Sequence, residues 1–244
     1  MSDAPTRVIV LNFTAKARGL AAAVADFFVG DRIELVVIGD GEAPRPSSPR
    51  LEVTTLRGDV EHGFDAYAER LRVEARIADA SAVIVLPQSG AAEVDAHSRL
   101  TCVAIRRACG EGPMPTTVVA IEDPEASFEF AGLGVTTIFY PGFLRAALFA
   151  HACVDLPVFH FILGLLRGAY RVDTLPVPEH LKGSTFRDAC RTLERGADGR
   201  PITLVGVFAE DPRGEGPAVM KINPSPAFAL AGARSLLAIG ERRA

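Results

Sequence analysis

The sequence predicts an α/β protein in which a parallel sheet with helices on both faces is followed by two apolar helices and a small α+β lobe. Three observations support this fold class. Six short apolar runs, typical of buried strands, alternate with helical patterns over residues 1–141. Two adjoining apolar helical stretches follow over residues 142–168. Shorter strand-like runs separated by turns then fill residues 169–244.

The first part of the chain alternates strands with helices. Six strands are predicted at residues 8–11, 33–38, 51–56, 82–86, 116–121 and 135–139. Helical spacing predicts helices that include residues 20–24, 66–80, 92–109 and 125–131. Because parallel strands need a crossover connection, this alternation predicts a Rossmann-like sheet covered by helices on both faces.

Two adjoining helices are predicted next, at residues 142–154 and 156–168, with a break at Pro157. Both are apolar around more than one face. Helices of this kind are buried somewhere. The sequence leaves two alternatives open: burial against the chain's own C-terminal lobe, or a dimer interface. For the lobe itself, the sequence predicts strands at 172–177, 202–208, 218–222 and 235–239, a helix at 185–193 and a turn at 211–216.

The composition excludes several classes of protein. The 244 residues carry a formal net charge of -4 and show no basic stretch, so a nucleic-acid partner is not expected. The longest apolar run, residues 156–166, is shorter than the roughly 20 residues of a membrane span. No signal peptide is visible. The four cysteines form no CxxC pair and are expected to be reduced, as in a cytoplasmic protein.

The turn after the first strand departs from the dinucleotide-binding pattern G-x-G-x-x-G, whose glycines let the backbone approach a pyrophosphate. Asn12 and Thr14 stand near the first two glycine positions, and Gly19 comes late. Side chains at these positions narrow the approach to the backbone. Asn12 and Thr14 either bind a ligand through hydrogen bonds or cap the following helix, and the sequence leaves both alternatives open.

Acidic residues follow three of the predicted strands. Asp40 and Glu42 come after the second strand, Asp59 after the third, and Glu122 and Asp123 after the fifth. The carboxyl ends of parallel strands share one edge of the sheet, where an acidic side chain can bind ribose hydroxyls or a hard cation. The alternatives are solvated turns for Asp40, Glu42, Glu122 and Asp123, and a helix cap for Asp59.

The sequence contains no recognisable catalytic constellation. None of the five histidines has metal-ligand spacing with another histidine or a cysteine, and the patterns HExxH and GxSxG are absent. Cys109 has no sequence neighbour that would activate its thiol. We therefore expect a binding module and not an enzyme.

Four stretches in order resemble one family over nearly the whole chain, the RCK domain (regulator of potassium conductance) of TrkA-N plus TrkA-C type. They are "LRGDVEHGFDAYAERLRVEARIADASAVIVLP" (56–87), "VVAIEDPEASFEFAGLGVTTIFYP" (118–141), "VDTLPVPEHLKGSTFRDA" (172–189) and "MKINPSPAFALAGARSLLAIGE" (220–241). The chain looks most like the cytosolic gating domain of prokaryotic potassium channels. The resemblance implies a TrkA-N-type lobe at residues 1–141, crossover helices at 142–168 and a TrkA-C-type lobe at 169–244.

The resemblance also implies a function. RCK domains form homodimers through their crossover helices, assemble into an octameric gating ring and control a potassium channel or potassium transporter at the inner face of the membrane. Transporter-type members hold NAD or adenine nucleotides over intact glycines, whereas several channel-type members have degenerate turns and respond to cations or other ligands. We therefore expect a divalent or monovalent cation before an adenine nucleotide or NAD. An NAD(P)-binding Rossmann oxidoreductase and a structural ring without a ligand remain the alternatives.

These expectations define two sets of candidate residues. Asn12, Thr14, Asp40 and Asp59 are the candidates for binding a cofactor. The candidates for binding a cation are Asp40, Glu42, Glu122 and Asp123.

Overall fold

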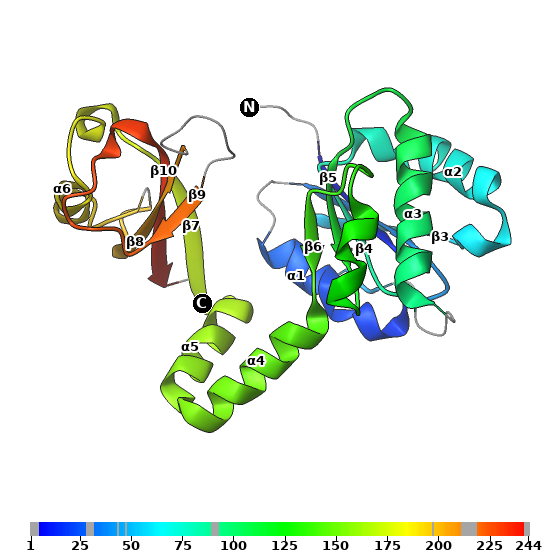
Figure 1. The fold of residues 1–244 in the computed structure, drawn as a ribbon, viewed down its shortest axis with the longest axis horizontal. Helices are drawn as coiled ribbons and strands as arrows, with labels where there is room; N and C mark the ends of the chain where they lie inside the picture. The colour runs from blue at the N-terminus through cyan, green and yellow to red at the C-terminus, as the bar shows by residue number, and fades with distance from the viewer. Residues whose placement is uncertain are drawn as a thin grey trace. The chain divides into compact units, whose positions relative to one another are not determined.

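The computed structural model describes residues 5–27, 32–42, 44–46, 48–88, 93–196, 198–210 and 219–241 (Figure 1). The chain divides into two units, Met1–Ala150 and His151–Ala244, and each is described by itself. The boundary between the units falls inside helix α4, Pro141–Val154.

The first unit is built on a six-stranded parallel sheet. Its strands are β1 (Thr6–Leu11), β2 (Ile33–Ile38), β3 (Leu51–Leu56), β4 (Ala82–Val85), β5 (Thr116–Ala120) and β6 (Thr137–Phe139), in the spatial order β3-β2-β1-β4-β5-β6. The order reverses between β1 and β4, which places a crevice at the carboxyl ends of these strands. The predicted Rossmann-like sheet is confirmed, with all six strands at the expected places.

Helices cover both faces of this sheet, as the alternating side chains of its strands require (Figure 1). Ile9 and Leu11 of β1 belong to the core under α2 (Phe64–Val73) and α3 (Val94–Cys109). Val8 and Val10 belong to the core under α1 (Gly19–Phe27). The strands β1 and β2 are therefore buried on both faces, which explains why they read as continuous apolar runs.

Two helical predictions in this unit need correction. The helix predicted over residues 66–80 ends at Val73, because Arg76 takes a left-handed conformation with φ 49° and a separate 3₁₀ turn, Ile77–Asp79, follows. The helix predicted over 125–131 is a 3₁₀ helix, Pro124–Phe130. Asp123 caps this short element by accepting a hydrogen bond from the backbone N–H of Glu125.

Two apolar helices, α4 and α5 (Leu156–Leu166), follow the parallel sheet. The chain breaks at Asp155, whose carboxylate accepts a hydrogen bond from the N–H of Val158 at 3.2 Å and caps α5. Pro157 lies in the first turn of α5, where no backbone N–H is needed. Within the described ranges, no helix has the length and apolar character needed to cross a membrane.

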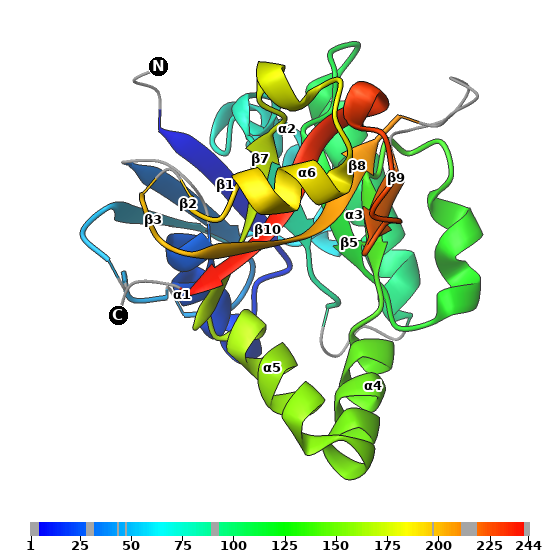
Figure 2. The ribbon, with the colours of Figure 1, turned by 90° about the vertical axis from the view of Figure 1, so that its left-hand side faces the viewer.

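The second unit contains an antiparallel sheet of β7 (Tyr170–Pro176), β10 (Ala233–Glu241), β8 (Ile202–Ala209) and β9 (Val219–Ile222), in that order. Figure 2 shows α6 (Phe186–Thr192) lying across this sheet. Phe186 and Ala189 of α6 pack with Leu204 and Leu236 in one core. The α+β lobe is thus confirmed, while the turn predicted at 211–216 lies outside the described residues.

Candidate functional site

The turn after β1 keeps the backbone shape of a glycine turn without a glycine. Asn12 has φ 58°, in the left-handed region that asparagine tolerates better than most residues. The backbone N–H of Phe13 then donates to Ile38 O at 2.9 Å, and the Phe13 side chain is buried. The residues from Ala15 to Ala17 form a 3₁₀ turn before α1 begins at Gly19. This described turn therefore lacks the glycines that let the backbone of a dinucleotide site approach a pyrophosphate.

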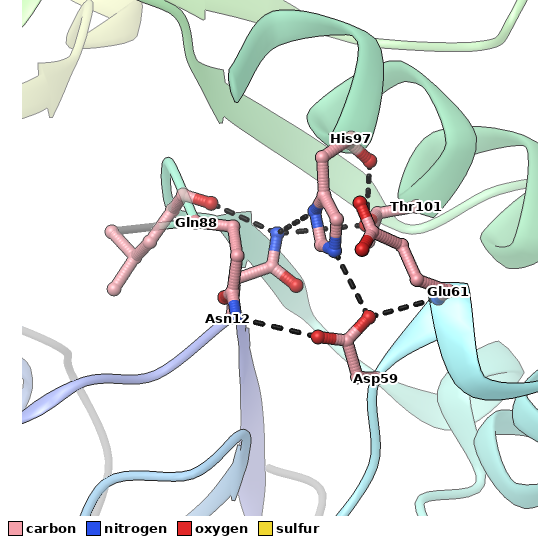
Figure 3. Close-up of polar contacts among 7 residues, drawn as sticks. Asn12, Asp59, Glu61, Gln88, His97 and Thr101 are labelled. Carbon is pink, nitrogen blue, oxygen red and sulfur yellow. Dashed lines mark hydrogen bonds and ion pairs between the residues drawn. The ribbon is translucent and has the colours of Figure 1, made fainter. Parts of the chain in front are cut away.

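The Asn12 side chain points into the protein (Figure 3). Its Nδ2 donates to Leu86 O at 2.9 Å and lies 3.4 Å from His97 Nδ1 and 3.5 Å from Thr101 Oγ1. Asn12 thus ties the end of β1 to the end of β4 and to α3. Thr14 is half-buried and makes no side-chain hydrogen bond to the 3₁₀ turn that it precedes. The capping alternative is therefore wrong for Thr14.

Asp59 lies at the centre of this group of polar side chains, just after β3. Its Oδ1 is 3.1 Å from His97 Nε2 and accepts the backbone N–H of Glu61 at 2.8 Å, while Oδ2 accepts from Gln88 Nε2 at 3.3 Å (Figure 3). Asp59 therefore caps the short 3₁₀ helix Val60–His62 and also lies in the crevice, the two roles that the sequence offered as alternatives. We call Asn12, Asp59, Gln88, His97 and Thr101 the crevice network.

The charge of Asp59 is fixed by these neighbours. Burial by itself raises the pKa of the Asp59 carboxyl, but the hydrogen bonds from the Glu61 backbone and from His97 outweigh it and leave the pKa below its ordinary value. Asp59 is thus a carboxylate that His97 and Gln88 hold at the edge of the sheet.

The partners of His97 assign its neutral tautomer. Asn12 Nδ2 is a donor that faces Nδ1, and the Asp59 carboxylate is an acceptor that faces Nε2. Nδ1 therefore accepts a hydrogen bond and Nε2–H donates one. Thr101 Oγ1 donates to His97 O at 3.0 Å and leaves a lone pair toward Asn12.

Asp40 and Glu42 do not join the crevice network. Asp40 is exposed after β2, and Glu42 forms an exposed ion pair with Arg18 at 2.7 Å. Gly39 packs so closely on Phe13 that a Cβ there would lie 2.4 Å from Phe13 O, which explains a glycine at that position. The role of Asp40 and Glu42 in binding stays a prediction.

Glu122 and Asp123 are arranged around a third carboxylate. Asp95 of α3 accepts the backbone N–H of Glu122 at 2.9 Å and that of Asp123 at 2.8 Å. The Asp123 side chain caps the following 3₁₀ helix, whereas the alternative that the sequence offered for Glu122 and Asp123 was a turn before Pro124. In the described part of the chain, no three histidine, cysteine or acidic side chains gather closely enough to hold a metal ion. The cation site at Asp40, Glu42, Glu122 and Asp123 stays a prediction.

Sequence reasoning missed His97 and Gln88. His97 was considered for metal-ligand spacing alone, and Gln88 lies in the segment after β4 that the sequence marks only by Pro87. His97 and Thr101 are four residues apart and so share a face of α3. Two polar side chains on one face of a helix that packs at the carboxyl ends of the strands were the signal that could have identified His97.

The helices α4 and α5 leave much of their apolar surface exposed. Phe143 is 75% exposed and Phe149 67%, and no side chain described in either helix is buried. Within the second unit, Phe161 of α5 packs against Tyr170 of β7, with ring centroids 5.6 Å apart. The alternative of burial against the C-terminal lobe therefore accounts for only part of α5.

No protein-family model and no curated protein matches the chain. Among solved structures, the human SLO3 gating ring matches 99% of this chain and 49% of its own, with a TM-score of 0.66 and 16% identity. The GsuK channel bound to NAD matches 99% of this chain and 37% of its own, with a TM-score of 0.43 and 20% identity. The crystal structure of the GsuK RCK domain matches 98% and 45%, with a TM-score of 0.41 and 19% identity. The chain thus spans less than half the length of each of these proteins.

The likeness to the gating ring includes residues of both units, since it covers nearly the whole chain. The fold expected from the sequence is thereby matched by the fold of the SLO3 gating ring.

Proposed function

We propose that this chain is a regulatory gating-ring domain that controls a potassium channel or potassium transporter. The observation that carries the proposal is the match of nearly the whole chain to the SLO3 gating ring, at a TM-score of 0.66. Binding, and not catalysis, is the proposed activity, because the polar side chains of the crevice network are used to join elements. The pore partner would hold the domain at the inner face of the membrane.

The proposed first partner is a second copy of this chain, bound through α4 and α5. Large exposed apolar surfaces mark interaction sites in proteins. The exposed large hydrophobic side chains of these helices are Phe143, Leu144, Phe149, Val154, Leu156, Val158, Phe161 and Leu166. Homodimers of this kind would then assemble into an octameric ring, as the family resemblance implies.

A ligand at the carboxyl ends of the strands would regulate this assembly. A ligand that binds one arrangement of the dimer more tightly shifts the population toward that arrangement. The proposed ligand is first a divalent or monovalent cation, at Asp40 and Glu42 or at Glu122 and Asp123. An adenine nucleotide or NAD is second, because the turn after β1 lacks the glycines that let the backbone approach a pyrophosphate.

Light scattering and a thermal-shift panel test this function together. We expect the purified chain to form dimers or larger rings, and a cation from a panel of Ca²⁺, Mg²⁺, Na⁺ and Zn²⁺ to raise the unfolding midpoint. A ligand at about a hundred times its dissociation constant adds roughly 2.7 kcal/mol, which moves the midpoint by several degrees. A chain that stays monomeric at every concentration contradicts the proposal. Saturable NADH binding with hydride transfer would favour an oxidoreductase instead.

A further inference from the structure

His97 is unusual among the histidines of this chain. All five lie in the described ranges, and His97 is the buried one, whereas His62, His151, His160 and His180 are exposed. It joins three parts of the first unit: α3, which carries it, Asn12 at the end of β1, and Asp59 after β3. A histidine changes its charge near neutral pH, so a buried histidine that links elements is suited to respond to protons.

The hydrogen bonds of the crevice network fit one protonation state only. With neutral His97, each donor in the chain from Asn12 through His97 to Asp59 meets an acceptor. A proton on Nδ1 would place an N–H against the Nδ2 donor of Asn12. Turning the Asn12 amide over would let Oδ1 accept from Nδ1–H, but it would break the bond to Leu86, because Oδ1 would then face Leu86 O, which is also an acceptor.

The two sides of His97 therefore respond to protonation in opposite ways. The contact with Asn12 is lost, because two donors face each other. The contact with Asp59 is strengthened, because a neutral hydrogen bond to a carboxylate becomes an ion pair. Asp59 remains a carboxylate here, since the Glu61 backbone N–H also holds its charged form.

The other ionisable groups near this part of α3 do not reverse this response. His62 favours the Asp59 carboxylate, and burial together with the Asp59 charge raises the pKa of the buried Tyr67. On the 3₁₀ helix packed against α3, Glu129 pairs with Arg99 at 2.6 Å. On α3 itself, the Asp95 carboxylate is occupied by two backbone N–H groups.

We propose that His97 is a proton-responsive switch in the crevice: neutral His97 ties the end of β1 to α3 through Asn12, and protonated His97 releases Asn12 while holding Asp59. Protons would thus change the edge of the sheet at which the proposed ligand acts. The inference depends on the proposed function only in regarding this crevice as regulatory. The switch itself is a property of the isolated chain.

Nuclear magnetic resonance of the full chain, labelled with ¹⁵N, tests the switch directly between about pH 8 and pH 5, the range in which histidine titrates. We expect the Nε2–H tautomer of neutral His97 at the upper end. On acidification, the Asn12 side-chain NH₂ resonances should move with the same midpoint as the His97 ring. Amide exchange at the end of β1, corrected for its intrinsic pH dependence, should rise about five- to tenfold on loss of one buried hydrogen bond.

Two variants make the test specific. In His97→Gln, the amide nitrogen can donate to Asp59 and the amide oxygen can accept from Asn12, so the tie becomes independent of pH and the Asn12 step should disappear. His62→Gln, which changes an exposed histidine, should keep the step. An Asn12 step that persists in His97→Gln overturns the proposal.

The tautomer of the unmodified chain decides the matter if the glutamine variant does not fold. An Nδ1–H tautomer at the upper end of the pH range, or an Asn12 signal that ignores the His97 titration, overturns the proposal. Because no ligand or ring is needed, failure of the gating function would appear separately, as a monomer without a thermal shift.

Discussion

At the scale of single residues, Asn12 combines two roles that a glycine could not. It supplies the left-handed backbone of the turn and three side-chain contacts behind it. We expect Asn12→Gly to lower the free energy of unfolding by about 1–2 kcal/mol, because Leu86 O and His97 Nδ1 lose their donor. Asn12→Ala should cost roughly a further 1 kcal/mol, since alanine also disfavours the left-handed region. Urea denaturation measures both, and an alanine variant at least as stable as the glycine variant contradicts this account.

Asp59 makes stability depend on pH in the acid range. The folded state lowers the pKa of Asp59, so the Asp59 carboxylate adds to the free energy of unfolding. This contribution is fully present above the pKa of the unfolded state, about 3.9, and is lost as the pH falls through the lower pKa of the folded state. We expect Asp59→Asn to flatten the fall of the urea midpoint below about pH 4 relative to the unmodified chain. Equal slopes for the two chains would show that the Asp59 charge does not stabilise the fold.

The sequence identified part of this site. Asn12 and Asp59 could be found because each comes within three residues of the end of a predicted strand, and strand ends share an edge. Their contacts could not be found, because the Asp59–His97 pair joins positions 38 residues apart through the packing of α3 on the sheet. The sequence offered a helix cap and a crevice residue as alternatives for Asp59, whereas its carboxylate has both roles at once.

At the scale of elements, α5 and β7 are held together by a glycine. A Cβ at Gly164 would lie 2.4 Å from the Tyr170 ring, so Gly164→Ala should force the ring off α5 and destabilise the second unit by about 1–3 kcal/mol. The matched control is Gly142→Ala in α4, where a Cβ meets nothing within 4 Å. Alanine there should stabilise the helix by roughly 0.5–1 kcal/mol. Thermal unfolding measures both, and similar effects of the two changes would contradict the packing argument.

Elements were predicted well where the apolar pattern alone decides them. The buried strand β2 has the bounds expected from its apolar run. The helix over 66–80 was overextended because helical spacing continues past Val73, while the left-handed turn at Arg76 follows from how Ala75 and Ile77 fit into the core. Local periodicity does not contain that information.

At the scale of the whole molecule, the apolar surface of α4 and α5 should hold two copies together. Phe149 is 67% exposed, so Phe149→Asp removes little packing from the folded chain, yet it would place a charge in the proposed interface. Loss of a buried aromatic residue from an interface costs about 2 kcal/mol or more, close to a thirtyfold rise in Kd.

Phe128 provides the matched control for this test of the dimer. It is 74% exposed on the 3₁₀ helix Pro124–Phe130, away from α4 and α5 in sequence, so Phe128→Asp makes the same chemical change outside the proposed interface. Sedimentation velocity over a range of concentrations should show dissociation of the Phe149 variant and an unchanged assembly for the Phe128 variant. If the Phe149 variant sediments like the unmodified chain with its fold intact, α4 does not form the interface. If both variants dissociate, the added charge and not its place on α4 accounts for the effect.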